Sequence, residues 1–224
     1  MVAGLAVFAV SAVASASASA QPHWWLCKKV TSGKFLNAHC TESGAGTWEW
    51  EALPAETSVK VKSKGGKSVL ESPGKIIECK KVEDTGSIEN PTGGGAGIGK
   101  LTEAKFSECT VTKPAKCTVT EPIVVKNAKT ALSEPEAGVF HETFTPEEEE
   151  GKLFTEIKLG GSECAGKGKF KVRGKATATV NGANAELTFT GALSELTLGE
   201  EVATFESKET QETEAGEGID VRNP

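Results

Sequence analysis

The sequence predicts an all-β protein, and three features of the chain indicate this fold class. Short segments of alternating apolar and polar residues recur from Ser58 onward, and Gly, Pro or Asn-Gly separate them. No segment sustains the 3.6-residue apolar period of a helix. Thr and Val, which favour strands, are abundant. We therefore expect an antiparallel β-sandwich, with a β-barrel as the alternative, because both consist of many short strands.

Residues 1–20 have the pattern of a secretory signal peptide. An apolar run from Leu5 to Val13 precedes small residues that end at Ala20, as in an A-x-A cleavage site. The run is shorter than the roughly 20 apolar residues that a membrane-spanning helix needs. We therefore expect a secreted protein, extracellular or at the cell surface, with no membrane segment after cleavage.

Residues 21–56 are expected to form a small module that contains all four tryptophans and the first two of six cysteines. Adjacent residues of a strand point to opposite faces, so Trp24 and Trp25 diverge, while Trp48 and Trp50 share a face. We expect one of the first pair and both of the second to pack over a disulfide. Trp24 and Trp25 are the candidate glycan-binding residues, because one of them is then left exposed to stack on a sugar ring.

Residues 57–207 are expected to form the β-sandwich itself. Alternating segments occur at residues 58–63, 68–72, 75–82, 98–112, 117–133, 153–161, 170–180, 185–193 and 201–207. The strongest hairpin signal is the NGAN sequence from Asn181 to Asn184. Residues 208–224 are acidic with almost no apolar side chain, and we expect them to be a disordered tail.

The six cysteines are expected to form three disulfides. Their number is even and no C-x-x-C pair occurs, which in an exported chain favours disulfides over a metal site. We favour one local pair and two pairs that join distant strands, with Cys109–Cys117 as the rival pairing. The favoured pairs are Cys27–Cys40, Cys79–Cys109 and Cys117–Cys164.

Composition and motifs argue against several functions. The formal net charge of −6 argues against nucleic-acid binding. The glycine-rich residues 94–101 lack the Ser or Thr that must follow the lysine of a phosphate-binding loop, and no G-x-S-x-G motif occurs. His23, His39 and His141 show no zinc spacing. We expect no cofactor, no metal and no catalytic residue, and hence no enzyme.

Residues 141–150, HETFTPEEEE, offer oxygen ligands for a hard cation, but a run of like charges is typical of a solvated loop. We expect such a loop here. Because Glu and Asp are plentiful, a pair of carboxylates acting as in a glycoside hydrolase stays an alternative.

Three stretches carry a resemblance to a protein family. They are the C-x(n)-GKFxxxxC and WEW pattern of residues 27–50, the block from KSKGGKSVLES to IIECKKVEDTGSIENP, and the frame from FSECTVTKPAKC to IKLGGSECAG. In this order they resemble uncharacterised exported proteins of high-GC Gram-positive (actinobacterial) soil bacteria. The resemblance spans nearly the whole mature chain and implies an exported, disulfide-bonded β protein, without an activity.

The sequence therefore predicts a monomeric, non-enzymatic structural or adhesive protein of the cell envelope or matrix. The first alternative is a module that binds cell-wall or environmental polysaccharide through Trp24 or Trp25. The second is a secreted hydrolase that uses two carboxylates.

Overall fold

The structure is a computed structural model that describes residues 21–147 and 153–224. The predicted signal peptide lies outside these residues. Fifteen strands and two short 3-10 turns, at Thr92–Gly94 and Gly191–Leu193, make up the regular structure of this part. The strands are β1 (His23–Phe35), β2 (Ser43–Ala52), β3 (Val59–Gly65), β4 (Ser68–Ser72), β5 (Lys75–Glu89), β6 (Ile98–Lys113), β7 (Thr118–Val119), β8 (Ile123–Glu136), β9 (Val139–Pro146), β10 (Leu153–Gly160), β11 (Gly168–Asn181), β12 (Glu186–Phe189), β13 (Glu195–Leu198), β14 (Glu201–Thr213) and β15 (Ile219–Arg222).

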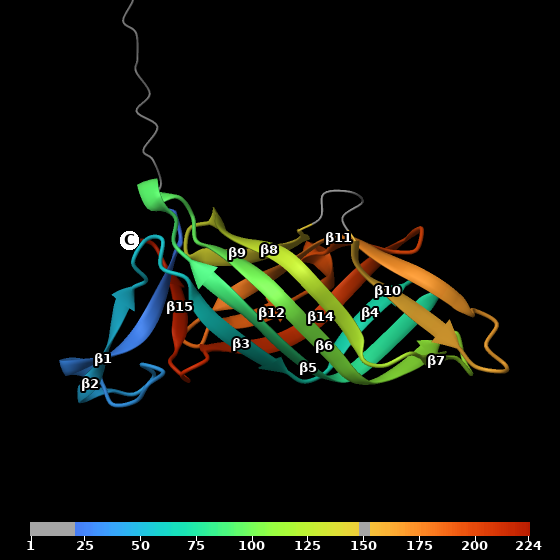
Figure 1. Ribbon diagram of the computed structural model, residues 1–224, viewed down its shortest axis with the longest axis horizontal. Coiled ribbons are helices and arrows are strands. Elements are labelled where there is room, and N and C mark those ends of the chain that lie inside the picture. The colour runs from blue at the N-terminus through green and yellow to red at the C-terminus, as the bar shows by residue number, and fades with distance from the viewer. Residues whose placement is uncertain (1–20, 148–152) are drawn as a thin grey trace, which may run out of the picture.

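One large antiparallel sheet forms the body of the protein and closes on itself (Figure 1). Its strands follow the order β12-β14-β3-β5-β6-β8-β9-β11, and β11 pairs back with β12. Three short strands pair with stretches of the long strands that are otherwise free: β4 pairs with β5 and β14, β13 pairs with β11 and β14, and β10 pairs with β11. These pairings lengthen the ring along its axis. The predicted antiparallel all-β fold is confirmed, and the two layers expected of a sandwich are opposite walls of one closed sheet.

Side chains from strands that do not pair with each other meet inside the ring. The Phe106 ring of β6 lies 5.9 Å from the Phe205 ring of β14, and the Phe144 ring of β9 lies 5.5 Å from the Phe189 ring of β12. The alternation of strand residues places these rings inward, as the period-two pattern requires. The hydrophobic core of the protein is thus the interior of the ring.

A separate three-stranded sheet, β15-β1-β2, lies at one end of the body and combines both ends of the described chain (Figure 1). Its inner face carries Trp24, Leu26, Ile219 and Val221, which are all buried and belong to the main core. Its other face carries the Cys27–Cys40 disulfide of the predicted N-terminal module. The small sheet therefore caps the core instead of forming an independent unit.

The prediction of a disordered acidic tail over residues 208–224 is wrong. Strand β14 continues to Thr213, and β15 pairs with β1. Composition concealed the strand because its inward positions are polar: Glu209 and Gln211 are buried, while Glu212 points outward and forms an ion pair of 3.1 Å with Lys62. A low apolar count therefore does not indicate disorder here.

The three disulfides are those favoured from the sequence, and the rival pair Cys109–Cys117 does not form. Cys79 and Cys109 lie directly opposite each other on β5 and β6. The third bridge, Cys117–Cys164, joins the segments next to the paired strands β7 and β10. Disulfides of this number indicate an oxidising environment for the protein. Within residues 21–147 and 153–224, no helix is long and apolar enough to cross a membrane.

Candidate functional site

An apolar cavity of about 120 Å³ lies inside the ring. Five phenylalanines line it, together with aliphatic side chains from most of the strands of the ring. A closed ring of about eight strands has an interior that side chains can just fill, or that holds one small ligand. The small side chains of Ala104 and Ala176 stand among the lining residues, and they leave space that larger side chains would fill. The phenylalanines are Phe106, Phe144, Phe154, Phe189 and Phe205.

Three acidic side chains point into the same interior from three different strands. Asp84 lies on β5, Glu142 on β9 and Glu209 on β14, at positions where the alternation of the strand turns them inward. Glu142 is 2% exposed and Glu209 is 5% exposed. Asp84 and Glu209 line the large cavity, and Asp84 and Glu142 line a smaller adjoining one. We call Asp84, Glu142 and Glu209 the carboxyl cluster.

A glycine makes room for one member of the carboxyl cluster. Gly65 on β3 is the direct cross-strand partner of Glu209. A Cβ atom at this position would lie 2.7 Å from Cγ of Glu209 and 2.6 Å from Cγ1 of Val82, which is closer than real Cβ contacts allow. The KGG sequence, which predicts a turn, therefore also permits a buried glutamate.

Burial raises the pKa of all three carboxyl groups. For Glu142, loss of solvent raises the pKa to about 7, the Thr130 side chain opposes this effect, and the charge of Asp84 adds to it. Loss of solvent also raises the pKa of Glu209 well above its ordinary value, and the neighbouring Asp84 raises it further. The Ser207 hydroxyl donates a 2.9 Å hydrogen bond to Glu209, which opposes the rise. Loss of solvent likewise raises the pKa of Asp84.

Three buried oxygen atoms on residues that line the smaller cavity have no hydrogen-bonding partner within the described part of the chain. They are Oε2 of Glu142, Oε1 of Gln211 and Oγ1 of Thr130. The Glu142 carboxylate and the Gln211 amide oxygen are acceptors, whereas the Thr130 hydroxyl can donate or accept. No group of three or more His, Cys, Asp or Glu side chains in residues 21–147 and 153–224 is arranged to hold a metal ion. The Glu142 and Gln211 oxygens can accept hydrogen bonds from a donor that enters this region.

The structure separates the two candidate glycan-binding residues. Trp24 is fully buried in the main core, where its Nε1 donates a 3.0 Å hydrogen bond to the carbonyl of Ile98. Its backbone N–H donates a 2.9 Å hydrogen bond to Oδ1 of Asn90. The suggested role of Trp24 in glycan binding is therefore wrong, because no sugar can reach a ring that the core encloses.

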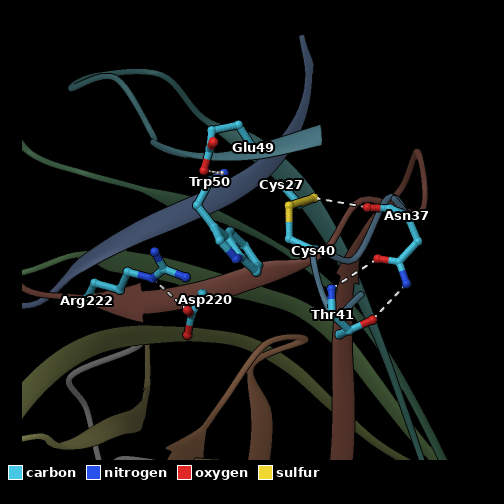
Figure 2. The surroundings of a disulfide bond; sticks show 8 residues. All are labelled: Cys27, Asn37, Cys40, Thr41, Glu49, Trp50, Asp220 and Arg222. Carbon is cyan, nitrogen blue, oxygen red and sulfur yellow. Dashed lines mark hydrogen bonds and ion pairs between the residues drawn. A yellow bond between two sulfur atoms is a disulfide. The ribbon is translucent and has the colours of Figure 1, made fainter. Parts of the chain in front are cut away.

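Trp25 lies on the other face of the small sheet, as the alternation predicts. Trp25 and Trp48 pack with Trp50 around the Cys27–Cys40 disulfide. The Arg222 guanidinium lies 5.6 Å from the ring centre of Trp25 and 4.8 Å from that of Trp50, and Asp220 holds it at 2.7 Å. Figure 2 shows Arg222 beside Trp50 and Asp220. The sequence predicted that Trp48, Trp50 and one of Trp24 and Trp25 pack over a disulfide, and this prediction is confirmed.

The other residues considered from the sequence do not come together. Nε2 of His23 lies 3.0 Å from the carbonyl of Gly95, and Nε2 of His39 lies 3.8 Å from Glu212. His141 belongs to β9, which ends at Pro146. The prediction of a solvated loop over residues 141–150 is therefore wrong for residues 141–146. Residues 148–150 lie outside the described part.

Sequence reasoning missed the carboxyl cluster. A local signal was present: in FHETF, Phe140, Glu142 and Phe144 share one face of a strand, so a glutamate stands between two inward rings. For Asp84 and Glu209 the signal is the period-two alternation of long strands, which puts Asp84 on the same face as Val82 and Glu209 on the same face as Gln211. That the three strands converge is a property of the closed sheet.

No protein-family model, curated protein or solved structure matches this chain. The structure shows an all-β protein with antiparallel sheets and three disulfides.

Proposed function

We propose that the protein is an exported, non-enzymatic binding protein that holds one small apolar molecule inside its ring. The observation that carries this proposal is the apolar cavity of about 120 Å³. Protein interiors are normally close-packed, and an empty cavity costs roughly 24 cal/mol per Å³, which amounts to about 3 kcal/mol here. A ligand that fills the cavity recovers this free energy. Apolar cavities of about this size bind molecules such as benzene.

Export is supported by two independent features, the signal-like pattern of residues 1–20 and the three disulfides. The resemblance to exported actinobacterial proteins agrees with it. Three other expectations stay predictions: a structural or adhesive role, a monomeric state, and a polysaccharide partner that binds at Trp25. Burial of Glu209 inside the ring argues against a carboxylate hydrolase, because a polymer would have to open the sheet to reach it.

The proposal is tested by titrating the folded protein with toluene in sealed calorimetry cells. We expect saturable one-to-one binding with a negative heat-capacity change, and a melting temperature that rises with toluene concentration. The variant Ala104→Leu fills the cavity and is expected to abolish binding. Ala131→Leu makes the same change at an exposed position of β8 and serves as the matched control. Equal binding by wild type and Ala104→Leu, or no binding by wild type, would overturn the proposal.

A further inference from the structure

We propose that the natural ligand is an amine: a small molecule with an apolar body about the size of one aromatic ring and an ammonium group that binds the carboxyl cluster. This inference rests on the proposed function and adds the chemical class of the ligand to it.

The carboxyl cluster forms the polar end of an otherwise apolar space. Asp84 lines both cavities, so it stands where the large apolar cavity meets the smaller one. Glu209 adjoins it from β14, and Glu142 lies on the side of the smaller cavity. A ligand whose body fills the large cavity therefore directs its head group at Asp84. This arrangement of an apolar wall with a few convergent polar groups is typical of small-molecule sites.

Two of the three unpartnered atoms are acceptors that a ligand donating hydrogen bonds would satisfy. Oε2 of Glu142 and Oε1 of Gln211 are acceptors on residues that are 2% and 5% exposed. A buried acceptor without a partner is unfavourable, and only a donor relieves it. An ammonium group has three donors and no acceptor. It is therefore the common organic head group that fits best.

The charge of the site also selects a cation. No basic residue occurs among the lining residues of the large cavity. In the wall of the smaller cavity Lys100 is the one basic residue, and its Nζ forms a 3.1 Å ion pair with Glu147 at a half-exposed position. Among the described residues that line the two cavities, no basic side chain pairs with the carboxyl cluster. A buried carboxylate is stable only when it is paired or protonated, and a bound ammonium supplies the missing charge.

Protons and the ammonium group compete for the same oxygen atoms. Burial holds the pKa of Glu142 at about 7, so protons occupy this carboxyl group in acid. An ammonium group that binds near neutral pH displaces such protons into solution. Binding of the amine is therefore expected to tighten between pH 5 and pH 8, whereas binding of a neutral molecule with the same body should change little.

The test compares three probes that share a phenyl body: 2-phenylethylamine, 2-phenylethanol and phenylacetate. In calorimetry at pH 8, we expect the amine to bind at least tenfold more tightly than the alcohol, and phenylacetate not to bind. Repeating the amine titration in buffers of different ionisation enthalpy should reveal proton release. Tightening of the amine by about tenfold from pH 5 to pH 8 is the third expected result.

Two variants assign the effect to the carboxyl cluster. Asp84→Asn and Glu142→Gln should each weaken the amine at least tenfold and leave 2-phenylethanol unchanged, so the alcohol also reports whether the variant is folded and its cavity intact. The control is Glu134→Gln. Glu134 is a half-buried glutamate of β8, and its carboxylate accepts hydrogen bonds from Gly138 and Asn223. If wild type binds the amine and the alcohol equally, the proposal of an amine ligand is refuted while the proposal of a cavity site stands. If toluene, the amine and the alcohol all fail to bind, both proposals are refuted.

Discussion

Glu142 makes the stability of the protein depend on pH, in the direction opposite to that of a salt-bridged carboxylate. The folded pKa of about 7 is higher than the ordinary value of 4.5. A group with a raised folded pKa contributes stability that is fully present below the unfolded pKa and is lost as the pH rises through the folded pKa. The protein should therefore be more stable at pH 5 than at pH 8.

The size of the effect follows from the difference between the two pKa values. At about 1.4 kcal/mol per pH unit, a rise from 4.5 to about 7 corresponds to about 3 kcal/mol of unfolding free energy, lost mainly between pH 4.5 and pH 7. Burial raises the pKa of Asp84 and Glu209 as well, so their contributions have the same sign. The loss in wild type should thus be larger than the part that Glu142 supplies.

Urea unfolding followed by tryptophan fluorescence, at pH 5 and pH 8 and equal ionic strength, measures this loss. Trp24 is fully buried and reports unfolding of the core. Glu142→Gln removes the titrating group without changing its shape, and it should reduce the loss by about 3 kcal/mol. In Glu134→Gln the loss should match wild type, because the lowered pKa of Glu134 places its titration below this window. An unfolding free energy in wild type that is constant or rises from pH 5 to pH 8 would refute the reasoning.

Three further predictions concern the framework of the fold, and all are measured by urea unfolding without reductant at pH 5. Asn90→Ala removes three buried hydrogen bonds of 2.8–3.0 Å that join Asn90 to the backbone of Trp24 and Leu53, and it should cost about 3 kcal/mol. Replacing Cys117 and Cys164 together by Ala should cost about 4 kcal/mol in the chain-entropy model, because this bridge spans 47 residues. Ile219→Ala should lower the unfolding free energy by about 3 kcal/mol because Ile219 is fully buried. An unchanged urea midpoint in this variant would instead indicate a disordered tail.

Much of the fold was predictable because it depends on local patterns. Period-two alternation located most of the strands, and the NGAN sequence marked the turn between β11 and β12. The faces of Trp24 and Trp25 followed from the same alternation. The even number of cysteines predicted three disulfides, and the favoured pairing of one local pair and two pairs between distant strands is confirmed. Apart from the disulfide pairs, these are all statements about a chain segment and its immediate neighbours.

The candidate site was not predictable in the same way. Glu142 stands in a segment whose acidic composition indicated solvent, and Glu209 stands in a segment that resembled a disordered tail. Composition averages over both faces of a strand, so it misses a strand with polar residues on its inward face. Only the burial of Glu142 and Glu209 reveals that these carboxyl groups face the interior.

The sequence by itself determined the fold class, the presence of disulfides and the alternation of strand faces, because these depend on short-range periodicity and on residue chemistry. The tertiary structure alone decided that the sheet closes, that the last strand completes the small sheet, and that three acids from distant segments line two adjoining cavities. The physical reason is that closure and convergence depend on pairings between residues far apart in the chain, such as β11 with β12 and β14 with β3. No local pattern encodes which distant strand supplies the missing hydrogen bonds.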